Sequence, residues 1–175
     1  PLFVETMYKR IWDEARKKGM DKKLKFALKL SNTLLHLKID IRDKLFKEVT
    51  AAFGGELKMM ISGGAPLDPE LIINFYALGI VILEGYGITE CAPLVSVNLP
   101  EKIKPHSVGH PVMGCTVKID TQAEDADGNI GEILVKGENV MLGYFKDPEA
   151  TKDAFTPDGW FKTGDFGYID KHGYI

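Results

Sequence analysis

Two short apolar runs, each followed directly by a glycine-rich segment, constrain the fold of this chain more than any other feature. The run 57–61 leads into Ser-Gly-Gly-Ala-Pro at 62–66, and the run 80–83 leads into Glu-Gly-Tyr-Gly at 84–87. Short apolar runs of this kind are typical of buried strands. Glycine lets a flat ligand approach the backbone, and ligands of open α/β sheets bind outside the carboxyl ends of the strands. Both segments are therefore candidates for a binding site, although each alone also fits an ordinary tight turn.

The residues between the two runs predict a helix over 69–78. Asp68 is placed to cap this helix, a proline occupies its first position, and Gly79 ends it. A strand, a helix and a strand within about 30 residues predict the crossover unit of a parallel α/β sheet.

The first 50 residues form a basic block with helical periodicity. They hold 13 Lys and Arg against 7 Asp and Glu, whereas the whole chain has a net charge of −3. The spacing predicts one helix that ends at Gly19, a second that Asp21 caps, and a third over 40–53. The first helix has an apolar face, formed by Phe3, Met7, Ile11 and Ala15. A basic amphipathic block can lie on anionic lipid, so peripheral membrane contact through 1–50 is one interpretation; a solvated face over a core-facing stripe is the simpler one.

After about Gly109 the pattern changes to short strands and tight turns. A hairpin turn is predicted at 125–129 and a helix around 147–155. We place a subdomain boundary near Pro105, which divides the chain into 1–105 and 106–175. The predicted class is α/β: a helical block leads into a parallel sheet flanked by helices, and a small β-rich subdomain of distorted-barrel type follows. Its strands are expected at 117–119, 131–136 and 168–169.

Composition excludes several classes of protein. With 175 residues, 45% apolar and 27% charged, the chain matches an ordinary globular domain and not a disordered one. The small net charge gives no reason to expect nucleic acid as a partner, and no apolar run reaches the roughly 20 residues of a spanning helix. Cys91 and Cys115 are too few for a disulfide framework, so we interpret them as reduced thiols of a cytoplasmic protein.

The segment 84–90 carries the side chains best suited to a nucleotide. Tyr86, between two glycines, can offer its ring to a base; such stacking contributes about 1–3 kcal/mol in other systems. Thr89 supplies a hydroxyl for a phosphate oxygen, and Glu90 is a lone carboxylate of the kind that holds magnesium together with substrate phosphates. A dinucleotide fingerprint is excluded, because Glu90 stands where its third glycine belongs and would repel a pyrophosphate.

A second acid follows in the β-rich part. Asp165 comes after Thr163 and Gly164, and a carboxylate that accepts from both ribose hydroxyls is a common nucleoside contact. Taken alone, Asp165 also fits a turn. The segments 131–137 and 140–144 are interpreted as structural, one as a strand and the other as a packed turn.

In this order the segments resemble the adenylate-forming superfamily of acyl-CoA synthetases, luciferases and peptide-synthetase adenylation domains. The resemblance runs from about Leu57 to Ile175 and is closest to the long-chain fatty-acyl-CoA synthetases. That closer likeness lies in the segments 91–96 and 158–161 and in the long basic helical block. The resemblance to this superfamily implies that Thr89 and Glu90 are catalytic, with Thr89 binding the α-phosphate and Glu90 binding magnesium. It also implies a set of nucleotide-binding residues, namely Gly64, Ala65, Glu84, Gly85, Tyr86, Gly87, Thr89 and Asp165.

The resemblance implies an enzyme that uses ATP, magnesium and coenzyme A to convert a long-chain fatty acid into its acyl-CoA through an acyl-adenylate. Two alternatives stay open: a non-catalytic module that binds AMP or ATP, and an adenylate-forming enzyme for another carboxylic acid. The chain lacks the family's Ser/Thr/Gly-rich phosphate loop and its adenylation lysine, begins at Pro1 and stops at Ile175 within a predicted hairpin. We therefore expect a piece of a longer protein, inactive alone, in which Tyr86 and Asp165 share one cleft.

Overall fold

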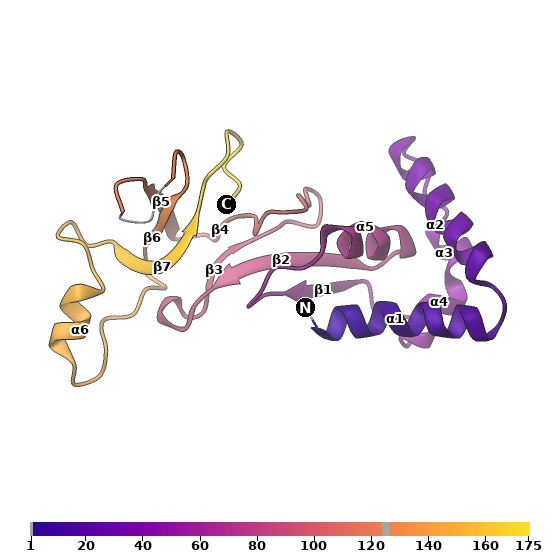
Figure 1. Ribbon diagram of the computed structural model, residues 1–175, viewed down its shortest axis with the longest axis horizontal. Helices are drawn as coiled ribbons and strands as arrows, with labels where there is room; N and C mark the ends of the chain where they lie inside the picture. Colours follow the sequence, from indigo (N-terminus) through magenta and orange to yellow (C-terminus); the bar gives the residue numbers. More distant parts are fainter. Residues whose placement is uncertain (1, 124–126) are drawn as a thin grey trace. The chain divides into compact units, whose positions relative to one another are not determined.

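The computed structural model describes residues 2–123 and 127–175. The chain forms two compact units, one up to Leu83 and the other from Glu84 onward. The subdomain boundary near Pro105 stays a prediction, because it concerns the larger fold of which we expect this chain to be a part. The predicted mixed α/β class is confirmed, with helices and two sheets (Figure 1).

The first unit is mostly helical. Its helices pack on one another chiefly through the pairs α1–α2, α2–α5 and α1–α5. Its elements are α1 (Leu2–Lys17), α2 (Asp21–His36), α3 (Arg42–Leu45), α4 (Lys47–Ala52), β1 (Met59–Ser62), α5 (Pro69–Leu78) and the start of β2 (Val81–Gly87). Of the part of the chain that the structure describes, no helix has the length and apolar character needed to cross a bilayer.

Three expectations for the basic block are wrong in detail. Phe3 is 71% exposed, so the predicted face of α1 is wrong at this residue; the helix buries Met7, which belongs to that face, together with Val4. Asp21 lies in the first turn of α2 and does not cap it; the cap position belongs to Met20, which makes no side-chain cap bond. The predicted helix 40–53 is broken at Phe46, which is almost fully buried. Burial of this ring overrides a continuous helical pattern.

The strand–helix–strand unit forms as the sequence predicts. Asp68 accepts a hydrogen bond from the backbone N–H of Glu70 at 2.9 Å, and Gly79 ends α5 in the left-handed conformation at φ 95°. Strand β1 is next to β2 in the sheet, and Val81 N–H donates to the carbonyl of Lys58 at 2.8 Å. The prediction that the first strand is buried is wrong for this chain, since β1 lies at an edge and exposes 69% of Ile61.

The second unit begins with the rest of β2, which pairs antiparallel with β3 (Leu94–Val97). Strand β3 in turn pairs antiparallel with β4 (His110–Pro111). The sheet that we predicted as parallel therefore contains antiparallel pairs. The chain reverses because the short 3-10 helix η1 (Thr89–Cys91) and the left-handed Ala92 follow β2 directly.

A three-stranded antiparallel sheet forms the rest of the second unit, with β6 (Gly131–Gly137) between β5 (Cys115–Asp120) and β7 (Phe161–Gly167) (Figure 1). The strand predicted at 168–169 is wrong, because β7 ends at Gly167. The turn prediction is confirmed over 127–130, where the residues Asp127 and Ile130 exchange backbone hydrogen bonds; residues 125 and 126 lie outside the described residues.

Two features complete the second unit. The predicted helix around 147–155 is confirmed as α6 (Pro148–Asp153), which Asp147 caps through the N–H of Ala150 at 2.9 Å. The core is a cluster of buried residues from several strands, with aromatic and aliphatic neighbours around it. Its members are Cys91, Val95, Ile133, Val135 and Phe161.

Candidate functional site

The candidate site of the second unit begins on β2. The sequence places Tyr86 in a loop after a strand, whereas in the structure the strand continues through Gly87. Glycine is required there, because a Cβ on Gly87 would lie 2.0 Å from the carbonyl oxygen of Pro93. Only glycine therefore allows the turn that leads back into β3 to lie this close to the end of β2.

Tyr86 and Asp165 lie together, although they are 79 residues apart in the sequence. The ring of Tyr86 packs beside the core cluster, and its hydroxyl donates a hydrogen bond to Oδ2 of Asp165 at 2.6 Å. Burial raises the pKa of Tyr86 above its ordinary value, and the bond to Asp165 raises it further. The phenol thus stays protonated and remains a donor at neutral pH.

Asp165 owes its position to a bulge in β7. Opposite Ile133 the register of β6 and β7 shifts, and three residues of β7 occupy the interval from 163 to 165. The hydroxyl of Thr163 donates to the carbonyl of Ile133 at 2.8 Å, and the N–H of Gly164 donates to Oε1 of Glu132 at 2.9 Å. A bulge leaves its residues without ladder partners and re-aims a side chain. Here it directs Asp165 toward Tyr86.

Glu90 has a partner that the sequence analysis missed. The hydroxyl of Tyr144 donates to Oε1 of Glu90 at 3.0 Å. This bond raises the pKa of the Tyr144 phenol, because the carboxylate stabilises the protonated hydroxyl. We interpreted 140–144 as a structural turn, and only the tertiary contact distinguishes its tyrosine from a packing residue.

The loop after β6 holds the turn that carries Glu90. The N–H of Met141 donates to the carbonyl of Glu90 at 2.7 Å. The side-chain amide of Asn139 donates to the carbonyls of Cys91 at 3.2 Å and of Leu94 at 2.9 Å. These bonds fix the backbone at Glu90 and in the residues that follow it, so its carboxylate extends from a turn whose backbone is held in place.

The remaining predicted site residues lie on β2, in η1 or in the first unit. Glu84 and Gly85 are buried on β2, and Thr89 is exposed at the start of η1. Gly64 and Ala65 follow β1 in the first unit. The structure thus brings Tyr86 together with Asp165, and the roles of all these residues at a nucleotide stay predictions.

A metal at this site would depend on one carboxylate. Among the residues that the structure describes, no group of three or more His, Cys, Asp or Glu side chains could hold a metal ion. Glu90 uses one carboxylate oxygen for Tyr144, which leaves the other for a cation. Magnesium is commonly held by one or two carboxylates together with substrate phosphates, so this donor set fits it.

The sequence profile of the AMP-binding enzyme family matches residues 3–145. The chain belongs to this family. The matched residues include Tyr86, Glu90 and Tyr144, and the match ends before Asp165.

Curated relatives include acyl-CoA ligases of several kinds. A long-chain-fatty-acid–CoA ligase, FadD15 of Mycobacterium bovis, is 40% identical over 143 residues, which cover 81% of this chain and 22% of that protein. Fatty acyl-CoA synthetase A of Dictyostelium discoideum is 34% identical, over 100% of this chain and 28% of that protein. The 2-succinylbenzoate–CoA ligase of Enterococcus faecalis is 36% identical, over 71% and 26%. The chain therefore spans about a quarter of the length of these relatives.

Solved structures have a fold similar to that of this chain. Apo MatB from Rhodopseudomonas palustris superposes with a TM-score of 0.64 at 33% identity, over 75% of this chain and 28% of that one. The O-succinylbenzoate coenzyme A synthetase MenE from Bacillus subtilis gives 0.59 at 31% identity, over 73% and 29%. The fold of this chain is thus part of the adenylate-forming fold.

Proposed function

We propose that the complete protein is an ATP-dependent long-chain fatty-acid–CoA ligase, to which this chain contributes adenylate-binding residues. The observation that carries the proposal is the hydrogen bond between Tyr86 and Asp165, which joins an aromatic ring and a carboxylate from distant parts of the sequence. The long-chain substrate is supported by the relatives that are named as long-chain ligases, at 34–40% identity. Membrane contact through residues 1–50 has no such support, and a cytoplasmic location stays a prediction.

In the proposed site, Tyr86 and Asp165 bind the adenosine. The ring of Tyr86 lies against the base, and the carboxylate of Asp165 accepts from the ribose hydroxyls. The Tyr86 hydroxyl bonds to Oδ2 of Asp165, so Oδ1, with its two lone pairs, is left to accept from the ribose hydroxyls. The pair thus orients the carboxylate before a nucleotide enters.

In the same proposal, Thr89 and Glu90 act at the phosphates. A fatty carboxylate attacks the α-phosphorus of ATP, the bond to the bridging oxygen breaks, and pyrophosphate leaves; the thiol of coenzyme A then displaces AMP from the acyl carbon and loses its proton. Thr89 donates to an α-phosphate oxygen. Glu90 would hold magnesium, whose positive charge would reduce the repulsion between the fatty carboxylate and the phosphates of ATP. Tyr144 keeps the carboxylate of Glu90 in place.

The proposal is tested by pyrophosphate exchange into ATP, measured on the complete purified protein with carboxylic acids of graded length. We expect exchange that depends on magnesium and is fastest with long-chain fatty acids. Exchange that is equally slow with every acid, together with tight AMP binding, would replace the ligase by a non-catalytic nucleotide-binding module.

A ligase for another acid is the second candidate, because the succinylbenzoate–CoA ligase of Enterococcus faecalis is 36% identical to this chain. The same pyrophosphate-exchange assay distinguishes this candidate from a long-chain ligase. Exchange that is fastest with an aromatic acid or a short dicarboxylic acid, and weak with palmitate, would establish this alternative and reject the long-chain substrate.

A further inference from the structure

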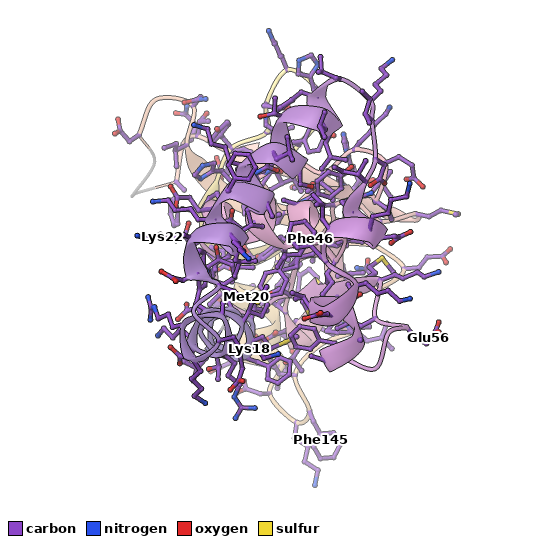
Figure 2. All side chains as sticks on the ribbon, turned by 90° about the vertical axis from the view of Figure 1, so that its right-hand side faces the viewer. Lys18, Met20, Lys22, Phe46, Glu56 and Phe145 are labelled. Carbon is purple, nitrogen blue, oxygen red and sulfur yellow. The ribbon has the colours of Figure 1, made fainter. Side chains whose placement is uncertain are left out.

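The first unit contains a cavity that the proposed function does not use. Its volume is about 690 Å³, and residues of α1, α2, α3, α4 and the turns between them line it. Phe46, which is 1% exposed, contributes to it from the break between α3 and α4. Figure 2 looks at the end of the first unit and shows Lys18 and Met20 close to Phe46. Much of the remaining lining is apolar, contributed by Ile11, Leu24, Val49 and Phe53.

Cations outnumber acids in this cavity. Two acids line the cavity, and one of them, Glu14, forms an ion pair with Lys17 at 2.8 Å. Five basic side chains line it: Arg10, Lys18, Lys23, Lys44 and Lys47. Within residues 2–123 and 127–175, none of these five forms an ion pair. An excess of uncompensated positive charge around an apolar cavity stands out in a chain with a net charge of −3.

We propose that this cavity binds a single-chain anionic amphiphile, namely a free long-chain fatty carboxylate. The apolar lining would cover the alkyl chain, while the lysine and arginine heads would attract the carboxylate. The volume is within the range of about 300–1,000 Å³ typical of small-molecule sites. A concave cavity of this size with basic side chains around it suits one bound molecule that has an apolar chain and an anionic head.

This site goes beyond the proposed function. It lies within the first unit, and none of the residues assigned to ATP lines it, including Gly64 and Ala65 of the same unit. The residues that would hold a fatty acid here are thus different from those assigned to ATP.

The test is photo-crosslinking of the complete protein with a palmitate that carries a diazirine in its alkyl chain, followed by mapping of labelled peptides. We expect labels within 10–27 and 44–53, and competition by unlabelled palmitate. Lys18→Gln combined with Lys23→Gln should lower this labelling about threefold or more, because two attractive charges are lost. Lys22→Gln combined with Lys25→Gln is the matched control: it removes the same charge from the same region, and neither residue lines the cavity (Figure 2 labels Lys22).

A variant that fills the cavity makes the test independent of charge. Ala27→Trp adds volume to the lining and should abolish labelling of 10–27 and 44–53, with circular dichroism used to confirm that the helices persist. Labels confined to other peptides, equal losses in the two lysine pairs, or labelling that requires anionic vesicles would each overturn the proposal. Pyrophosphate exchange is measured in parallel: a labelled cavity in a protein without exchange would reject the ligase and retain this site.

Discussion

The two units hold their polar groups in different ways. In the second unit, side chains from distant positions bond to each other: Tyr86 reaches Asp165 across 79 residues, and Tyr144 reaches Glu90 across 54. In the first unit, long-range bonds run from a side chain to the backbone: the hydroxyl of Ser31 donates to the carbonyl of Ala77 at 2.9 Å, and the guanidinium of Arg42 donates to the carbonyl of Tyr76 at 3.0 Å.

This difference separates a scaffold from a preorganised site. A bond from a side chain to a backbone carbonyl fixes how two helices pack, whereas a bond between two polar side chains fixes the orientation of a group that can meet a ligand. The second unit should therefore be sensitive to the loss of single polar atoms. The cavity of the first unit depends on volume and summed charge, so conservative changes there should have small effects.

The largest effect is expected for Glu90→Ala in the complete protein. Removal of the one carboxylate assigned to magnesium should lower the rate of pyrophosphate exchange about 100-fold to 1,000-fold, as the loss of one electrostatic contact to a transition state does elsewhere. AMP binding, measured by calorimetry, should change much less. Glu101→Ala removes an exposed acid of the same unit and serves as the control. Equal exchange rates and metal requirements in Glu90→Ala and the parent would remove Glu90 from the site.

Gly87→Ala tests the turn that carries Glu90. The added Cβ would lie 2.0 Å from the carbonyl oxygen of Pro93, so the backbone must move, and we expect a loss of about 3 kcal/mol or more in the free energy of unfolding. Gly64→Ala is the counterpart in the first unit. There φ is +81° but nothing lies within 4 Å of the added Cβ, so only the backbone strain of about 1 kcal/mol is expected. Thermal unfolding of both variants measures the contrast, and equal losses would contradict it.

Asp165→Ala should affect nucleotide affinity more than rate. If its carboxylate accepts from the ribose hydroxyls, the loss of these charge-assisted bonds should raise the KM for ATP about tenfold or more. Asp153→Ala, an exposed acid on α6, is the matched control. An unchanged KM for ATP in Asp165→Ala would show that the ribose is bound elsewhere.

The sequence predicted the local parts of the fold well. The helix 69–78 was predicted with its cap and its terminal glycine because each depends on residues only a few positions apart. The same local reasoning failed at Phe46, where burial of one ring breaks a helix that the pattern extends through it.

The candidate site shows where such reasoning stops. Tyr86 and Asp165 were identifiable as residues next to glycine, since glycine marks a sharp backbone change, and Glu90 as a lone carboxylate in the same short segment as Tyr86. Tyr144 was not, because nothing in the segment 140–144 reveals that its hydroxyl meets an acid 54 residues earlier. The bulge at 163–165 was likewise predicted only as a turn, because the register of two strands depends on both of them.

Tyr144→Phe removes one hydroxyl and leaves the ring. The carboxylate of Glu90 then loses the bond that orients it, so we expect the magnesium concentration for half-maximal exchange to rise about threefold, in line with the loss of one neutral-to-charged hydrogen bond at an exposed position. The KM for ATP at saturating magnesium should stay nearly constant, which a general disruption of the site would not allow. Tyr168→Phe, another exposed tyrosine of the same unit, is the control.

The smallest expected effect concerns pH and the turn that precedes Ile175. Asp170 bonds to Lys104 and accepts from the N–H groups of His172 and Tyr174, at 2.8 and 2.9 Å. The bond to Lys104 lowers the pKa of Asp170 well below its ordinary value of 3.8. A carboxyl whose pKa is lower in the folded state stabilises that state above its unfolded pKa, and the contribution is lost as the pH falls below about 4.

The difference in melting temperature between the parent and Asp170→Asn should therefore be constant above about pH 5 and shrink toward pH 2. Asp40 provides the comparison in the first unit, because its bond to Arg42 at 2.6 Å also lowers its pKa. That pair is only two residues apart and orders a local turn, whereas Asp170 joins segments 66 residues apart. Asp40→Asn should consequently give the same dependence on pH with a smaller amplitude. A larger amplitude for Asp40→Asn would mean that long-range polar contacts do not distinguish the second unit from the first.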